Sequence, residues 1–148
     1  MTGSTRAYQP GGNKPSQALA HATPAESVAL GLLEALERRA LDEAQRLLAP
    51  GFALVFPGPA RFRSLEEMVA GAAGRYRRIA KLVEDIESFE ADGKAVVYVR
   101  GTLYGVNTHG VEFSGVRFID RFLIANGLIE QQDVWNDLAE SGVLALRP

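Results

Sequence analysis

The second half of the chain changes from a helical to a strand-like distribution of apolar residues. From residue 83 onward, apolar side chains alternate with polar ones or run continuously over four long stretches, 83–91, 94–104, 111–124 and 128–137. Asp92-Gly93, a loop over 105–110 and Asn126-Gly127 separate them. A period of two is typical of strands, and Asp-Gly and Asn-Gly favour tight hairpin turns. The pattern predicts four consecutive antiparallel strands.

The first half carries helix signals. Thr23-Pro24-Ala25-Glu26 combines an N-cap threonine, a proline at the first helical position and a glutamate at the third, which is a capping box. Leucines and other apolar residues follow at helical spacing up to residue 48, with a break near 39–42, which predicts two helices joined by a bend. Residues 52–56 lie between Pro-Gly sequences and are predicted to form a short strand.

A second capping sequence, Ser64-Leu65-Glu66-Glu67, predicts a third helix that continues to about Leu82. The basic run 75–81 then falls in its last turns, where cations complement the helix dipole. Helices followed by meandering strands predict an α+β fold in which three N-terminal helices pack on a curved, mainly antiparallel sheet.

Composition narrows the classes of function. The 148 residues are 47% hydrophobic, which fits one soluble domain, expected over 23–148 after a flexible tail over 1–22. The absence of cysteine excludes thiol nucleophiles and cysteine-ligated metals, and two histidines make a histidine metal site improbable, so no metal or cofactor is expected. A net charge of −2 offers no footprint for nucleic acid or an anionic membrane. The sequence contains neither a secretory leader nor a membrane-length apolar run, and a cytoplasmic location is expected.

The order of elements resembles the nuclear transport factor 2-like superfamily, and the stretch from Gly115 to Leu138 resembles the closing hairpin of its SnoaL-like branch. The resemblance covers about residues 24–140. It implies a cone-shaped roll that encloses one hydrophobic pocket. Members include ketosteroid isomerases, limonene-epoxide hydrolases, polyketide cyclases and non-catalytic proteins, so the fold does not settle the function.

The chain departs from the catalytic sets of these relatives. Phe56 stands where ketosteroid isomerases carry their general-base aspartate, although Asp120 can match their oxyanion-stabilising aspartate. Arg100 matches the arginine of limonene-epoxide hydrolases, but the partner aspartate is replaced by Thr102. Where the cyclases carry His-Trp-Asp, this chain has Gln132-Asp133-Val134. The three best-known chemistries are therefore disfavoured.

Alternation predicts which side chains face the pocket. Within 111–124 the better core face carries Phe118, Asp120 and Phe122, which places one carboxylate between two aromatic rings. Desolvation there disfavours the charged carboxylate unless a cation lies near. We expect Arg100 to be that cation, with Tyr98 and Thr102 on the same face. An internal ion pair that only stabilises the fold remains an equal alternative.

Two registers are open for the last strand. A three-residue turn with a bulge places Gln132, Val134 and Asn136 in the pocket, whereas a two-residue turn places Asp133 and Trp135 there. The first is favoured, because it leaves Asp133 and Trp135 beside Arg117 and Arg121 on the outer face. That face, with Ile119, Leu123, Val97 and Val99, is expected to form a homodimer interface.

These expectations define a candidate site. Its catalytic residues are Asp120 and Arg100, and its ligand-binding residues are Tyr98, Phe56, Phe118, Phe122, Gln132, Val134 and Asn136, with Leu54 as a further wall. The sequence favours a cofactor-independent isomerase, cyclase, dehydratase or hydrolase acting on a small hydrophobic molecule. It leaves open a non-catalytic ligand-binding or dimeric interaction module.

Overall fold

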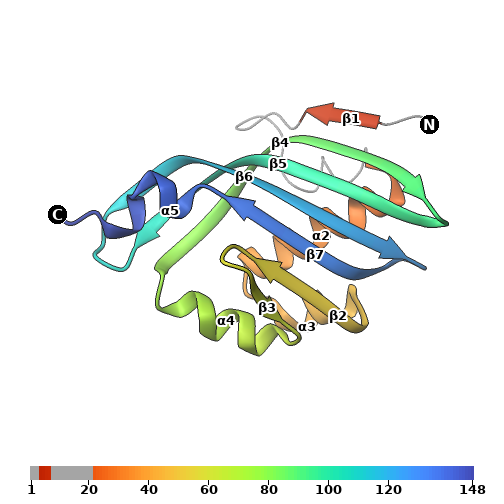
Figure 1. Cartoon of the computed structure of the whole chain (residues 1–148), viewed down its shortest axis with the longest axis horizontal. Coiled ribbons are helices and arrows are strands. Elements are labelled where there is room, and N and C mark those ends of the chain that lie inside the picture. Colours follow the sequence, from red (N-terminus) through yellow and green to blue (C-terminus); the bar gives the residue numbers. More distant parts are fainter. Residues whose placement is uncertain (1–3, 8–21) are drawn as a thin grey trace.

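The computed structural model describes residues 4–7 and 22–148. In this part of the chain one mixed sheet of seven strands, in the order β1-β4-β5-β6-β7-β2-β3, is covered on one face by helices. Figure 1 shows the long strands β4 to β7 lying side by side in a strongly curved layer, with α2 crossing one face. The α+β class and the cone-shaped roll are confirmed.

The first helix begins and the bend after it falls where the sequence predicts, whereas the second helix ends at Arg46 and Leu48, predicted as helical, begins a strand. Helix α2 (Pro24–Glu37) has the capping box, since the Glu26 amide donates to Thr23 Oγ1 over 3.1 Å and the Thr23 amide donates to Glu26 Oε1 over 2.9 Å. The bend before α3 (Leu41–Arg46) contains Arg39, whose φ of 58° is left-handed. Strand β2 (Leu48–Phe56) includes the strand predicted over 52–56 and starts four residues earlier.

The third helix is shorter than predicted. Helix α4 spans Leu65–Ala73 and ends at Gly74, and strand β4 (Tyr76–Ala91) begins two residues later. The basic run 75–81 therefore belongs mainly to a strand, and its assignment to the end of a helix was wrong. Glycine is a common helix terminator, and the following Ile79, Lys81 and Val83 have the spacing of one strand face.

The remaining strands form the predicted meander. Strands β5 (Lys94–Asn107), β6 (Glu112–Ala125) and β7 (Leu128–Asn136) pair antiparallel in sequence order. Strand β2 then runs parallel to β7, and β3 (Ala60–Phe62) pairs with β2. Of the segment 1–22 expected as a tail, Ser4–Ala7 form β1 on the edge of β4, whereas 1–3 and 8–21 lie outside the described residues.

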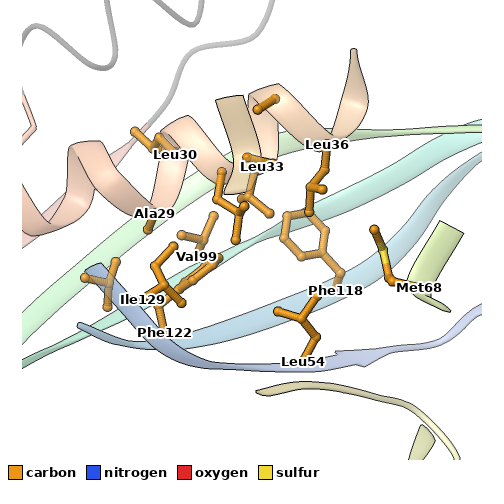
Figure 2. Packing of buried hydrophobic residues seen from close by; sticks show 14 of the residues in the cluster. Ala29, Leu30, Leu33, Leu36, Leu54, Met68, Val99, Phe118, Phe122 and Ile129 are labelled. Atoms are coloured by element: carbon orange, nitrogen blue, oxygen red, sulfur yellow. The ribbon is translucent and has the colours of Figure 1, made fainter. Parts of the chain in front are cut away.

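The hydrophobic core lies between α2 and the inner face of the sheet. Figure 2 shows Leu33 and Leu36 of α2 directed toward Phe118 and Val99 of the sheet. Phe118 and Val99 are 4% and 0% exposed, and Phe122 is also fully buried. The core face predicted for β6 is therefore confirmed.

Two bulges in β4 decide which of its side chains face inward. The register shifts by one residue between Tyr76 and Arg78 and again between Val83 and Asp85. Because a one-residue shift reverses the side-chain alternation, the odd-numbered Lys81 and the even-numbered Ile86 lie on the same, inner face. The inner partners of these two residues on β5 are Leu103 and Val99.

The last hairpin combines features of both predicted registers. Its turn has two residues, Asn126 and Gly127, both with positive φ. A register shift at Glu130 then adds one residue to β7, so that Gln132 pairs with Phe122, Val134 with Asp120 and Asn136 with Phe118. The inward orientation of Gln132, Val134 and Asn136 is confirmed, although the extra residue is in the strand and not in the turn.

The C-terminal segment is hydrogen-bonded to the end of strand β5. Helix α5 (Leu138–Ser141) and the short helix η1 (Val143–Ala145) follow β7. The buried Asn107 amide donates to the carbonyls of Val143 and Leu146 over 2.9 and 2.8 Å. None of the helices in the described ranges has the length and apolar character required to span a bilayer.

Candidate functional site

A cavity of about 80 Å³ opens between the helices and the inner face of the sheet. Its walls come from the end of α2, from α4 and from strands β2, β4, β5 and β7, and they are mainly apolar. Its polar and charged lining residues are Glu37, Arg39, Arg75, Tyr76, Lys81, Gln132 and Asn136. The cavity is smaller than the few hundred Å³ of typical ligand pockets. It holds only part of a ligand unless flexible lining residues such as Met68 move.

A buried ion pair lies beside this cavity. The Lys81 ammonium on β4 binds Asp120 Oδ2 on β6 and lies 4.8 Å from the centre of the Phe118 ring. The Asp120 side chain is completely buried, and the Lys81 side chain is 21% exposed. Asp120 is not among the lining residues, but its hydrogen-bond partner Lys81 is.

Gln132 completes the polar cluster. Its Nε2 donates to Asp120 Oδ2 over 3.4 Å. Asp120 Oδ1 and Gln132 Oε1 are buried and have no hydrogen-bond donor among the described residues. Buried acceptors of this kind cost free energy unless a water or ligand supplies a donor. The cluster is therefore costly for the fold and is suited to binding a polar group.

Three titratable groups with raised pKa values gather around the cavity. Burial raises the pKa of Asp120, and Lys81 and Gln132 partly oppose this rise. Desolvation also raises the pKa of Glu37, against the hydrogen bond from the Lys81 backbone amide and the Lys81 charge. Burial raises the pKa of the Tyr76 hydroxyl, opposed by Arg39 and Arg75. Such clustering of shifted groups in a concave site is typical of functional sites.

The structure places four of the predicted site residues in the cavity wall, namely Phe56, Gln132, Val134 and Asn136. Asp120, Phe118 and Phe122 lie in the inner layer directly behind this wall. Leu54 is fully buried in the core.

The predicted pairing of Arg100 with Asp120 is wrong. Asp120 pairs in register with Val99, and Arg100 pairs with Ile119 on the outer face, where its guanidinium binds Asp85. Tyr98 also lies on the outer face and stacks on Phe89 with ring centres 6.4 Å apart. Val97 and Val99, expected outside, are fully buried. The apolar set of β5 is buried and the polar set faces outward, as burial energetics require.

Sequence reasoning missed Lys81, which takes the position expected for Arg100. The cause is the third helix, which was predicted to continue to about Leu82 although it ends at Ala73, and which therefore placed Lys81 on a helix surface. Gly74 and the alternating Ile79, Lys81 and Val83 were the signals that could have located it. Glu37, Arg39, Arg75 and Tyr76 were missed because their meeting depends on the packing of α2 against β4.

A second depression lies on the outer face of the sheet. This open groove of about 750 Å³ is lined by the Pro57–Pro59 turn, Arg100, Ile119 and Trp135, among others. Trp135 is 52% exposed and pairs in register with Ile119. Within residues 4–7 and 22–148 no three histidine, aspartate or glutamate side chains lie together as metal ligands do.

The fold and the inner cavity define a nuclear transport factor 2-like protein, and comparison with known families is more specific. The SnoaL-like domain profile matches residues 29–132, so the chain belongs to the SnoaL-like domain family. No curated protein sequence matches the chain.

Solved structures with the same fold are distant in sequence. TerC, crystallised with polyporic acid, superposes with a TM-score of 0.69 at 14% identity, covering 84% of this chain and all of TerC. A putative SnoaL-like polyketide cyclase from Shewanella putrefaciens superposes with a TM-score of 0.68 at 10% identity, covering 90% of this chain and 95% of the cyclase. An NTF2-like protein of unknown function from Burkholderia pseudomallei superposes with a TM-score of 0.66 at 18% identity, covering 84% of this chain and all of that protein. At these identities the likeness shows the fold alone.

Proposed function

We propose that the chain is a cofactor-independent enzyme that moves a proton on a small, mostly apolar molecule, as an isomerase, cyclase, dehydratase or hydrolase does. The observation that carries this proposal is the Lys81–Asp120 pair beside a cavity whose lining carries Glu37 and Tyr76, two groups with raised pKa values. A charge pair in an apolar interior rarely improves stability over apolar residues of the same size, which supports a functional reason for keeping it.

The cavity residues have complementary roles in this proposal. Lys81 donates a hydrogen bond to a ligand carbonyl oxygen and stabilises the negative charge that develops there. Glu37, whose pKa is raised by desolvation, accepts the proton from the adjacent carbon and returns it to the product. Asp120 does not contact the ligand but positions Lys81 through their ion pair. Phe56, Val134 and Asn136 form part of the cavity wall, and Gln132 Oε1 accepts a hydrogen bond from a hydroxyl group of the ligand.

The test begins with a thermal-shift screen of lactones, epoxides, enones and polycyclic ketones. A ligand at about a hundred times its Kd adds roughly 2.7 kcal/mol to the stability, which such a screen detects. Each ligand found is then assayed for turnover with wild type and with Lys81→Met and Glu37→Gln. We expect either substitution to lower kcat by roughly a hundredfold or more.

Glu34→Gln is the matched control, because Glu34 lies one turn earlier on α2 and does not line the cavity. It is expected to leave kcat unchanged. Turnover that persists in Lys81→Met and Glu37→Gln would show that the chemistry lies elsewhere. Ligand binding without turnover in wild type would instead support the non-catalytic binding module.

We also infer that the outer sheet face joins two copies of the chain. Trp135 and its cross-strand neighbour Ile119 are apolar side chains on a surface otherwise rich in charge, and exposed aromatics of this kind are enriched at interfaces. The nearby charges are already paired within the chain, since Arg117 Nε binds Asp137 over 2.7 Å and Arg121 lies 3.8 Å from Asp133. Burial of this face therefore leaves few unpaired charges.

A further inference from the structure

Two arginines line the part of the inner cavity that we call its mouth, because Arg39 is exposed to solvent and Arg75 is only half-buried. Arg39, after the end of α2, and Arg75, between α4 and β4, both line it. Neither forms an ion pair with a carboxylate of the described residues, whereas several other arginines of the chain do. Cations that line a cavity without a carboxylate partner are suited to binding an anion.

The backbone holds both arginines in place. Arg39 has a φ of 58° in the α2–α3 bend, and its Nη1 donates to the Leu36 carbonyl over 3.0 Å. This contact uses one of the five guanidinium donors and a hydrogen bond with the Tyr76 hydroxyl uses another, which leaves further donors for a ligand. Arg75 is half-buried directly after the helix terminator Gly74. Tyr76 lines the same cavity, and the charges of Arg39 and Arg75 both oppose the rise that burial causes in the pKa of its hydroxyl.

The charges around the cavity are unbalanced. Lys81 is neutralised by Asp120, and Glu37 is the one carboxylate among the lining residues. Arg39 and Arg75 therefore leave the mouth with an excess of positive charge on a chain whose formal net charge is −2. A local positive potential on an acidic protein attracts anionic ligands to that point.

We propose that the ligand of this cavity carries a carboxylate, which Arg39 and Arg75 bind at the mouth while the apolar body of the ligand enters between α2 and the sheet. Guanidinium groups bind carboxylates with paired, charge-assisted hydrogen bonds. This inference rests on the proposed function only in placing a ligand in the cavity, and it does not require turnover.

The test compares phenylacetate with phenylacetamide, two molecules of nearly the same shape that differ in charge. Binding is measured by NMR titration of the full chain at low ionic strength. We expect phenylacetate to bind more tightly and to shift the amide signals of Arg75 and Tyr76. In Arg75→Gln and Arg39→Asn its Kd is expected to rise roughly fivefold or more, whereas the Kd of phenylacetamide stays constant. Asparagine is chosen at position 39 because it tolerates a positive φ.

Arg61→Gln is the matched control, since Arg61 is an exposed arginine that does not line the cavity, and it is expected to leave both Kd values unchanged. Salt provides a second measurement on wild type alone, because only the binding of phenylacetate should weaken as ionic strength rises. The proposal is overturned if the two probes bind equally, if neither binds, or if the shifts centre on Trp135. Failure to find any turnover would overturn the proposed enzyme while leaving a carboxylate preference intact.

Discussion

Burial and nearby charge act in opposite directions on Asp120. Its side chain is inaccessible to water, and Lys81 and Gln132 provide its polar contacts through a single oxygen, Oδ2. The raised pKa means that the folded protein binds this proton more tightly than the unfolded chain does. The carboxylate therefore makes stability depend on pH.

The sign of that dependence follows from the direction of the shift. A raised pKa contributes stability below the ordinary value of 3.8, and this contribution is lost as pH rises toward the folded-state pKa. We predict that the unfolding free energy of wild type minus that of Asp120→Asn falls with rising pH, by up to about 1.4 kcal/mol per unit. Chemical denaturation of both proteins between about pH 4 and 7 measures this difference. Glu37 is present in both proteins, so its contribution to the pH dependence cancels in the difference. A difference that rises with pH would mean that attraction to Lys81 outweighs desolvation.

The buried side of this site was accessible from sequence, whereas its charged partner was not. Asp120 between Phe118 and Phe122 follows from simple alternation, and the inward side of Gln132 follows from the favoured register. Lys81 faces inward only because a bulge at Glu84 separates it from the rest of β4, and no residue type marks that bulge. The two arginines at the mouth depend on how α2 packs against β4, which local patterns do not contain.

At the scale of elements, the two bulges of β4 fit glycines of β5. Gly105 pairs with Ile79 near the first bulge, and Gly101 pairs with Val83 beside the second. A Cβ atom at either position would collide with a backbone oxygen of β4, that of Arg78 or of Leu82. Glycine therefore allows the close approach that the curved sheet requires.

We predict that Gly101→Ala and Gly105→Ala each lower the unfolding free energy by about 2 kcal/mol or more, because backbone atoms must move to admit the new methyl group. Gly74→Ala is the control, since its Cβ would meet nothing within 4 Å and its φ is −87°. It should be neutral or up to about 1 kcal/mol more stable. Urea denaturation of the three variants gives the comparison. Equal effects at positions 74 and 101 would contradict the proposed close approach.

Element types were predictable wherever local signals agreed. The capping box fixed the start of α2 at Thr23, and the Asp92-Gly93 and Asn126-Gly127 turns gave the hairpins. The end of α4 was not predicted, because Tyr76 and Ile79 also fit a helical face when Gly74 is treated as tolerated. That one error assigned residues 76–82, the first part of β4, to a helix and with them Lys81.

At the scale of the whole molecule, we expect two copies of the chain to associate through the outer face of the sheet. Wild type is expected to sediment as a dimer at micromolar concentration. Ile119→Glu is expected to sediment as a monomer, because the new carboxylate would face either the same carboxylate of the second copy or an apolar surface of that copy. Leu146→Glu, at an apolar residue 49% exposed elsewhere on the surface, should remain dimeric. Sedimentation of a monomeric wild type at all concentrations would refute the interface.

The proposed function also implies that the molecule gives up stability to keep its inner charges. Removal of one partner of a buried ion pair leaves an uncompensated charge and costs about 3–5 kcal/mol, whereas replacement of both by apolar residues is often neutral or stabilising. A site retained for function is expected to follow this pattern. An ion pair retained only because it stabilises the sheet is not expected to follow this pattern.

The measurement that tests this claim most directly is the unfolding free energy of wild type, Lys81→Met, Asp120→Val and the double variant, determined together at neutral pH. We predict that each single substitution destabilises by about 3 kcal/mol or more and that the double variant is at least as stable as wild type. A double variant whose loss equals the sum of the two single losses would contradict the account, because Lys81 and Asp120 would then be independent structural residues.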